Sequence, residues 1–381
     1  MKKLVLAVAI AAALSSYTVA RAATHIVDLG TLGGNYSGAA GLNDNGQVFG
    51  TSTLPGEASQ HAFSWTQAGG MIDLGTLGGN WSTGNAMNST GQIVGGSTTA
   101  GDASQHAFSW TQAGGMIDLG TLGGSYSYAY AVNDKGQVVG TSALPDDSSH
   151  AFSWTQAGGM IDLGTLGGWG SAAFAVNGLG QVVGQSNIPG DTSHAFSWTA
   201  AGGMIDLGGL GGNYSSAAAV NDSGQIVGDA ILPGDATYHA FSWTQAGGMI
   251  DLGTLGGTHT ETYGTFAVNA NGQVVGVSTA SGDSSWHAFL WTQPGGMTDL
   301  GTVGSIWNTP PALNDNGDVV GCRIAADGWW HAFSWTPAGG MIDLGTLGGS
   351  SSGAYAVNTK GKVVGESRTA GDAATHAVTW R

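Results

Sequence analysis

Histidine and aspartate recur at regular intervals along the chain, and both residue types can ligate metals or transfer protons. The histidines belong to a phrase of the form His-Ala-Phe-Ser-Trp and stand at His61, His106, His150, His194, His239, His287, His331 and His376. The aspartates belong to a phrase of the form Ile-Asp-Leu-Gly and stand at Asp28, Asp73, Asp118, Asp162, Asp206, Asp251, Asp299 and Asp343. A metal needs converging ligands, whereas equivalent residues of successive repeats lie apart. We therefore interpret both sets as structural and expect neither a metal site nor a cofactor.

Aromatic rings are the next candidates, because they follow the Gly-Gly pair that closes most repeats. They are Tyr36, Trp81, Tyr126, Trp169, Tyr214, His259 and, shifted in position, Trp307. Exposed rings can stack on sugar faces while neighbouring Asn and Ser side chains form hydrogen bonds. The alternative is that each ring packs on the neighbouring repeat.

The sixth and seventh repeats depart furthest from the common pattern. Their unusual residues are His259, Glu261, Tyr263, Trp286, Trp307, Trp329 and Trp330. We expect these side chains to form a ligand patch on two adjacent repeats, with sequence drift as the alternative. His259 and Glu261 are also candidates for acid–base catalysis, although no second carboxylate is clearly paired with Glu261.

Each repeat divides into four short strand-like pieces. In the first repeat they are 37–43, 47–51, 61–66 and 71–74. Tight turns join the first piece to the second (Asn43 to Gly46) and the third to the fourth (Gln67 to Gly70), and the other two connections are longer. Four antiparallel strands in ~45 residues are typical of one β-propeller blade. The sequence predicts an all-β protein, a β-propeller of eight four-stranded blades whose first strands are innermost.

The two ends of the chain carry complementary parts of a blade. Residues 25–30 read as a fourth strand without predecessors, and residues 376–381 read as a third strand without a successor. Pairing them would close the ring and remove exposed sheet edges. We expect residues 23–381 to form this single domain, with both long connections of each blade on one face and both tight hairpins on the other.

The repeated phrases resemble a known family. His-Ala-Phe-Ser-Trp, Met-Ile-Asp-Leu-Gly-Thr-Leu-Gly-Gly and Asn-Asp-x-Gly-Gln-Val-Val-Gly resemble the HAF-repeat family of bacterial proteins across essentially all of the chain after residue 22. The resemblance implies an extracellular bacterial protein. It brings no catalytic residues with it.

Composition and the first residues bear on location and partners. Lys2 and Lys3 precede an apolar stretch from Leu4 to Leu14, which is typical of a signal peptide; we expect it to span residues 1–22. The protein is then exported, either extracellular or periplasmic, with no membrane insertion. Acidic residues outnumber basic ones 25 to 9, for a net charge of −16. Such a surface repels nucleic acid, so we expect none as a partner.

We therefore expect a secreted, monomeric, non-enzymatic binding or scaffold protein whose ligand is a glycan or cell-surface polysaccharide. The runner-up is a glycan-active hydrolase or lyase with its site on the sixth and seventh blades. A purely structural surface protein is the third possibility.

Overall fold

The fold is seen in a computed structural model of the chain. It describes residues 25–381 except 191, 235–236, 262–266, 283–284 and 304–310. The predicted signal peptide lies outside these residues. Apart from two short 3-10 turns, η1 (Ala100–Asp102) and η2 (Ala370–Asp372), every regular element in the described part is a β-strand. The all-β prediction is confirmed.

The strands form antiparallel groups, most of them four-stranded, which we refer to as blades and name after their strands. The first groups are β2 (Ser37–Leu42), β3 (Val48–Thr53), β4 (Gln60–Thr66) and β5 (Gly70–Asp73); β6 (Gly78–Met87), β7 (Ile93–Thr99), β8 (Gln105–Thr111) and β9 (Gly115–Asp118); β10 (Ser127–Val132), β11 (Val138–Ala143), β12 (Ser149–Thr155) and β13 (Gly159–Asp162); and β14 (Ser171–Val176), β15 (Val182–Asn187), β16 (Ser193–Thr199) and β17 (Gly203–Asp206). A single parallel bridge between Gln60 and Trp81 links the first two groups.

The remaining groups follow the same order. They are β18 (Ser215–Val220), β19 (Ile226–Ile231), β20 (Tyr238–Thr244) and β21 (Gly248–Asp251); β22 (Gly256–Glu261), β23 (Ala267–Val268), β24 (Val274–Ala280), β25 (Trp286–Thr292) and β26 (Gly296–Thr302); β27 (Ala312–Leu313), β28 (Val319–Ile324), β29 (Trp330–Thr336) and β30 (Gly340–Asp343); and β31 (Gly348–Val357), β32 (Val363–Thr369) and β33 (Thr375–Trp380) with β1 (Ile26–Asp28). The four strand pieces expected in the first repeat match β2–β5 to within two residues.

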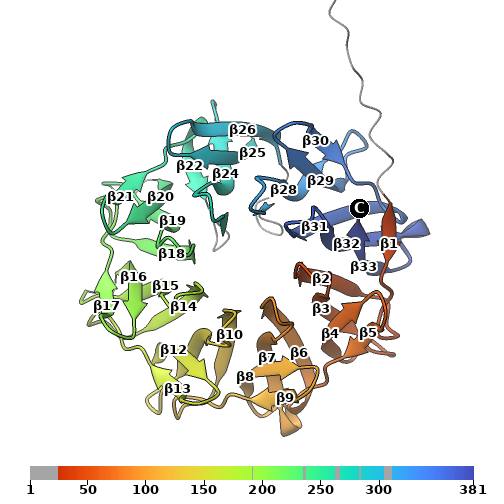
Figure 1. Ribbon diagram of the computed structural model, residues 1–381, viewed down its shortest axis with the longest axis horizontal. Coiled ribbons are helices and arrows are strands. Elements are labelled where there is room, and N and C mark those ends of the chain that lie inside the picture. The colour runs from red at the N-terminus through yellow and green to blue at the C-terminus, as the bar shows by residue number, and fades with distance from the viewer. Residues whose placement is uncertain (1–24, 191, 235–236, 262–266, 283–284, 304–310) are drawn as a thin grey trace, which may run out of the picture.

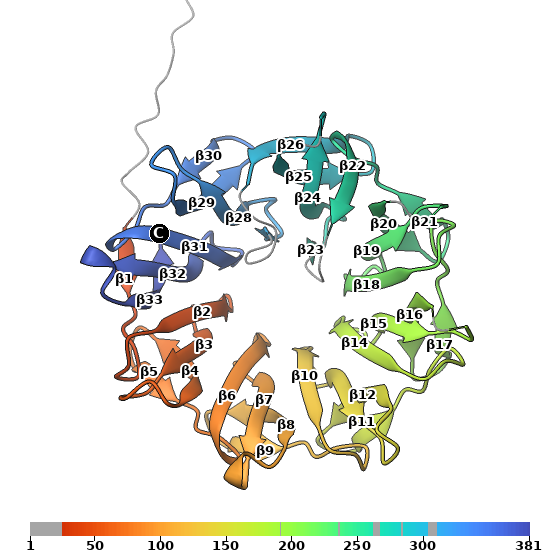
Figure 2. The same cartoon turned by 180° about the vertical axis from the view of Figure 1, so that it is seen from behind.

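The blades stand around a central axis with their first strands innermost, as Figures 1 and 2 show from opposite sides. This is the arrangement of a β-propeller. The strand β1 at the start of the described chain pairs antiparallel with β33 at its end, so that Ile26 lies opposite Trp380 and Asp28 opposite Val378.

The hydrophobic core is a set of separate layers, each between two neighbouring blades. Successive residues of a strand point to opposite faces, so Val138 packs toward the preceding blade and Val139 toward the following one. Both are fully buried, and β11 is buried along its whole length. This explains why the second strand of each repeat begins with two adjacent apolar residues. A blade can bury its two faces only against its two neighbours.

A serine at the start of most first strands fastens each blade to the preceding one. Ser82 is fully buried; its hydroxyl donates to the Gly75 carbonyl at 2.7 Å and accepts from the Ala62 amide at 2.9 Å. The same geometry joins the two ends of the chain. There, Ser37 donates to Gly30 and accepts from Ala377.

The hairpins between the first and second strands are linked from blade to blade. The Asn133 side chain donates to the main-chain carbonyl of Asn177 at 3.0 Å, and Asn358 donates to Asn43 at 3.2 Å. Gly50 on β3 shows how closely the strands approach, because a Cβ atom there would lie 2.0 Å from the Gly38 carbonyl oxygen. Glycine is therefore required at this point of the sheet.

The serine contacts yield a stability prediction. In Ser82→Ala the Ala62 amide and the Gly75 carbonyl lose a buried partner, so we expect unfolding free energy to fall by about 1–3 kcal/mol. Chemical denaturation measures this loss. Ser125→Ala, at an exposed position, is the control and should change stability by less than about 0.5 kcal/mol. Equal stability of the two variants would contradict the role given to Ser82.

Candidate functional site

The propeller has two chemically different faces. On one lie the long connections, and in two blades the described residues show that these contact each other: the Asn80 amide donates to Asp102 Oδ1 at 2.8 Å, and the Ser350 amide donates to Asp372 Oδ1 at 2.7 Å. On the other lie the tight hairpins that carry the asparagines described above. We call these the long-loop face and the hairpin face. Because the strands of a blade run antiparallel, the two faces lie at opposite ends of the strands.

The repeated histidines and aspartates form pairs within blades. His61 Nδ1 lies 2.9 Å from the Asp73 carboxylate, and the equivalent pairs in the other blades span 2.8–2.9 Å. Asp73 Oδ1 also accepts from the Gly75 amide at 2.7 Å. Each pair fastens a third strand to the fourth strand and to the turn that follows it. His376 and Asp28 do so between the two ends of the chain. The structural interpretation of these residues agrees with this geometry.

Four of the sequence-predicted rings are only partly exposed and contact the preceding blade: Tyr36, Trp81, Tyr126 and Tyr214. Tyr36 Oη donates to Glu366 Oε2 at 3.0 Å, and Tyr214 Oη donates to Gln185 Oε1 at 3.3 Å. Burial, reinforced by Glu366, raises the pKa of Tyr36 well above its ordinary value. Burial, reinforced by Asp229, raises the pKa of Tyr214 to about 12. Both phenols therefore stay protonated at neutral pH and serve as donors.

Trp169 differs from these rings, because it is not the structural equivalent of Tyr36. The Gly170 carbonyl accepts from the Asn187 amide at 2.8 Å, just as the Tyr36 carbonyl accepts from the Thr53 amide at 2.9 Å. Gly170 thus holds the place of the ring, and Trp169 holds the place of Asn35. The aromatic residue after the Gly-Gly pair therefore stands one position earlier in this repeat than in the first repeat.

Because Gly170 stands where the first repeat has Tyr36, a pocket is left on the long-loop face between the β10–β13 and β14–β17 blades. It measures about 190 Å³ and is lined by Ser149, Trp169, Gly170, Ser171, Ala172, Gln185, Ser186, Asn187 and Ser193. Trp169 is 62% exposed beside it. The lining side chains are uncharged, and Asn187 donates to Ser193 Oγ at 3.0 Å. An exposed indole beside fixed amide and hydroxyl groups offers both a stacking surface and hydrogen bonds.

The patch expected on the sixth and seventh blades is described only in part. Tyr263, Trp307 and the side chain of Glu261 lie outside the described residues. His259 Nδ1 lies 2.7 Å from Thr258 Oγ1, and Trp286 packs on the apolar layer between β24–β26 and β27–β30. Trp330 is partly buried at the start of β29. Trp329, which precedes it, is 52% exposed.

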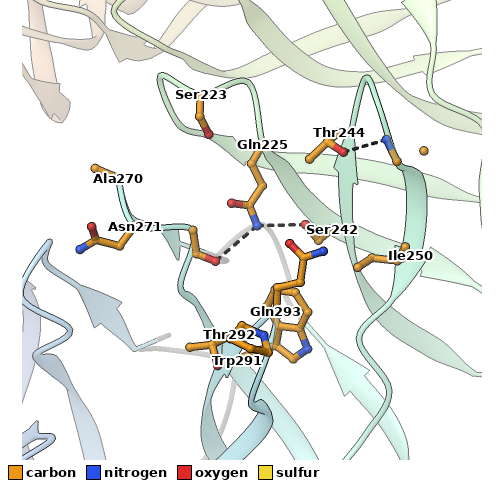
Figure 3. A pocket seen from close by; sticks show the side chains of 14 residues that line it. Ser223, Gln225, Ser242, Thr244, Ile250, Ala270, Asn271, Trp291, Thr292 and Gln293 are labelled. Atoms are coloured by element: carbon orange, nitrogen blue, oxygen red, sulfur yellow. Dashed lines mark hydrogen bonds between the residues drawn. The ribbon is translucent and has the colours of Figure 1, made fainter.

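The hairpin face carries larger pockets that the sequence interpretation missed, because it treated the hairpins only as turns. One, of about 470 Å³, lies between the β18–β21 and β22–β26 blades (Figure 3). In it, Gln225 Nε2 donates to Ser242 Oγ at 3.0 Å and to the Gly272 carbonyl at 3.4 Å. A second, of about 460 Å³, occupies the equivalent place where the two ends of the chain meet. Its lining includes Lys360, Lys362 and Arg381. All three belong to the last 22 residues of a chain with few basic residues, and this clustering is visible in the sequence.

Two further observations concern metals and membranes. Among the described residues, no group of three or more His, Cys, Asp or Glu side chains could hold a metal ion. The described part of the chain also holds no helix with the length and apolarity needed to cross a bilayer.

Comparison with known proteins supports the fold but identifies no family. No family model and no curated protein matches the sequence. Among solved structures, the chain is similar to the Dos1 propeller (TM-score 0.55, 11% identity, 93% of this chain and 94% of that one). It is also similar to the β-propeller domain of the Trilobed protease from Pyrococcus furiosus (TM-score 0.54, 10% identity, 81% and 97%) and to oligogalacturonate lyase from Vibrio parahaemolyticus (TM-score 0.52, 10% identity, 94% and 98%).

These similarities establish a β-propeller. The chain spans only 63% of the length of TolB from Acinetobacter baumannii (TM-score 0.44) and 58% of that of a puromycin hydrolase (TM-score 0.54), which it also matches. Propellers of this shape occur in binding proteins and in enzymes, so the fold alone is compatible with both.

The unequal exposure of the indoles can be measured in solution. Trp169 and Trp329 are the exposed tryptophans of the described chain, whereas Trp110 is 7% exposed. We expect acrylamide to quench the fluorescence of Trp169→Phe and Trp329→Phe clearly less than that of the parent. Trp110→Phe is the control and should leave the quenching constant unchanged. A parent-like constant for both exposed-site variants would contradict the exposure described here.

Proposed function

We propose that this protein is an exported, non-enzymatic, carbohydrate-binding β-propeller that recognises a glycan or cell-surface polysaccharide on its long-loop face. The observation that carries the proposal is Trp169, 62% exposed beside a small pocket lined by uncharged polar side chains. Trp329 supplies a second exposed ring. The other rings predicted as ligand contacts would take part at their exposed edges.

The chemistry of the pocket fits a neutral sugar better than a charged ligand. A pyranose ring has an apolar face that an indole can cover, and hydroxyl groups around its rim that amides and hydroxyls can bind. Gln185, Asn187 and Ser193 supply such groups beside Trp169. None of the lining residues is charged, and a volume of about 190 Å³ suits one sugar residue rather than a whole chain. A polysaccharide would then continue across the face toward other exposed rings.

For the architecture, we propose eight four-stranded blades in a closed ring, formed by residues 23–381. The eight repeats support the count. The contacts between the two ends of the chain support closure: β1 pairs with β33, His376 binds Asp28, and Asn358 donates to Asn43. The first two are the contacts that join the third strand to the fourth within other blades, and the third is the contact that joins consecutive blades elsewhere.

Export and family follow from the sequence features. We propose that residues 1–22 are a signal peptide, that the protein is a bacterial member of the HAF-repeat family, and that it acts as a monomer outside the cytoplasm. The alternative activity, a glycan hydrolase or lyase, would rest on Glu261 and His259. A turnover of polysaccharide that is lost in Glu261→Gln would replace the binding proposal.

The binding proposal has a test that the chain itself supplies. The double variant Trp169→Asn/Gly170→Tyr gives this blade the Asn35-Tyr36 sequence of the first repeat, so it should fold while filling the pocket. On an array of neutral oligosaccharides, we expect the parent to bind and the double variant to lose at least about tenfold in affinity, since stacking on one indole is worth a factor of that order. Isothermal titration with the best array ligand measures the change.

Two controls separate binding from folding. Trp110→Phe changes a buried indole on another blade and should bind like the parent. The thermal midpoint of the double variant should equal or exceed that of the parent. Parent-like affinity in the double variant and in Trp329→Ala would overturn the proposal for this face.

Ring closure can be tested by moving β1. Deleting residues 23–30 leaves β33 as an unpaired edge, and we expect a lower thermal midpoint and oligomers in size-exclusion chromatography. Adding the deleted residues after Arg381, through the hairpin sequence Gln-Ala-Gly-Gly, should restore the midpoint and a single species. A deletion variant as stable as the parent would show that the ring does not depend on this pairing.

A further inference from the structure

Positive charge is concentrated at one place on the hairpin face. The chain has nine Lys and Arg residues, three of which precede residue 25, so 9 − 3 = 6 lie in the described part. Three of these six, Lys360, Lys362 and Arg381, line the same pocket of about 460 Å³. It lies where the β31–β33 blade meets the β2–β5 blade, and we call it the seam pocket.

The hydrogen bonds of the seam pocket leave part of this charge uncompensated. Lys360 Nζ donates to the Asp44 main-chain carbonyl at 2.7 Å, and Arg381 Nη2 donates to Gln67 Oε1 at 3.0 Å. Both acceptors are neutral. Asp44 is the one carboxylate side chain among the lining residues, and its Oδ1 accepts from the Thr359 amide at 3.0 Å.

Lys362 is the central group. Its Nζ lies 5.1 Å from the centroid of the Trp65 ring, which attracts a cation through its π face. Burial, and then the neighbouring Arg381 guanidinium, lowers the pKa of Lys362. Two like charges therefore lie close together, Lys362 partly buried and Arg381 exposed, and an anion placed between them would relieve the repulsion.

The pocket of Figure 3 is the neutral counterpart of the seam pocket. It has nearly the same volume and the same place between two blades, and its Trp291, Thr292 and Gln293 match Trp65, Thr66 and Gln67. Uncharged residues occupy the positions of the three cations: Ser223 is equivalent to Lys360, Gln225 to Lys362, and Thr244 to Arg381. Ring geometry does not demand positive charge here, because the equivalent pocket forms without any.

We propose that the seam pocket is an anion site that binds a carboxylate-bearing saccharide, a hexuronate, with its carboxylate between Lys362 and Arg381. The site lies on the face opposite Trp169 and does not depend on the function proposed for that residue. A guanidinium offers two parallel donors to a carboxylate, and the ammonium adds a point charge. The volume exceeds that of a bare carboxylate, and Asn45, Thr66 and Gln67 supply uncharged partners for sugar hydroxyls.

The test compares ligands that differ only in charge. Glucuronate, its neutral amide glucuronamide, and acetate are titrated against the full protein at low ionic strength by NMR. We expect glucuronate to bind about tenfold or more tightly than either of the others, since a charge-assisted contact contributes on this scale. Added salt should weaken glucuronate binding. Equal affinity for glucuronamide would overturn the charge assignment, and equal affinity for acetate would overturn the saccharide assignment.

The neutral counterpart supplies the matched variants. Lys360→Ser/Lys362→Gln/Arg381→Thr replaces the three cations of the seam pocket with the residues of the neutral pocket and should abolish the preference for glucuronate. The single variant Lys362→Gln, which leaves the other contacts across the blades in place, should weaken glucuronate binding about tenfold, and Lys362→Arg should retain it.

A reverse variant distinguishes loss of the anion site from loss of folding. Ser223→Lys/Gln225→Lys/Thr244→Arg places the cations in the neutral pocket and should add a second glucuronate site to the protein. Thermal midpoints are measured for all variants. Parent-like glucuronate binding in a folded triple variant of the seam pocket would overturn the proposal, as would the absence of a second site in the folded reverse variant.

Discussion

No blade of this protein encloses a core of its own, and this constraint governs the rest of the structure. A four-stranded sheet has two faces, and in each blade both are apolar in the second and third strands. Phe49 faces the following blade while its neighbour Val48 faces the preceding one. Burial is complete only when a sheet stands between two others, so the stability of each blade belongs to its interfaces. The buried serine that ties most blades to the preceding one meets the same need for the polar main chain at those interfaces.

This constraint separates residues that build the ring from residues that are free to vary. The His–Asp pairs, the hairpin asparagines and the buried phenylalanines recur because each contacts an equivalent partner in most blades. A change at one of them would disturb an interface. Other positions in the loops at the ends of the strands carry no such requirement. Chemistry can therefore differ from blade to blade there, as the exchange at Trp169 and Gly170 and the three cations of the seam pocket both show.

Much of the fold could be predicted from the sequence, because the repeat length, the turn residues and the alternation of apolar positions all describe local structure. The strands of the first repeat lay within two residues of their predicted bounds. Trp169 was not distinguished from Tyr36 in the sequence, because the rings were grouped by residue type and not by their place relative to the strand. The serine seven residues after the Gly of Ile-Asp-Leu-Gly would have given the correct register, because its hydroxyl returns to that glycine. The hairpin-face pockets were missed for another reason: they form between repeats, so no single repeat contains one.

The cations of the seam pocket raise the question of whether they serve the ring or a ligand. In five blades the residue at the position of Lys362 is a glutamine whose amide binds a serine of its own blade, as Gln47 does with Ser64 at 2.9 Å. At the seam that serine is replaced by Thr379, and Lys362 faces Trp65 and the neighbouring guanidinium instead. A residue selected only to stabilise its blade would gain more from the neutral amide, which binds a hydroxyl of that blade without repulsion. Lys360, by contrast, bridges directly to the Asp44 carbonyl and so does serve the ring. The stabilising and the ligand-directed roles are thus divided between two lysines two residues apart, and the repulsion between Lys362 and Arg381, which the Trp65 ring lessens, is offset further when an anion lies between them.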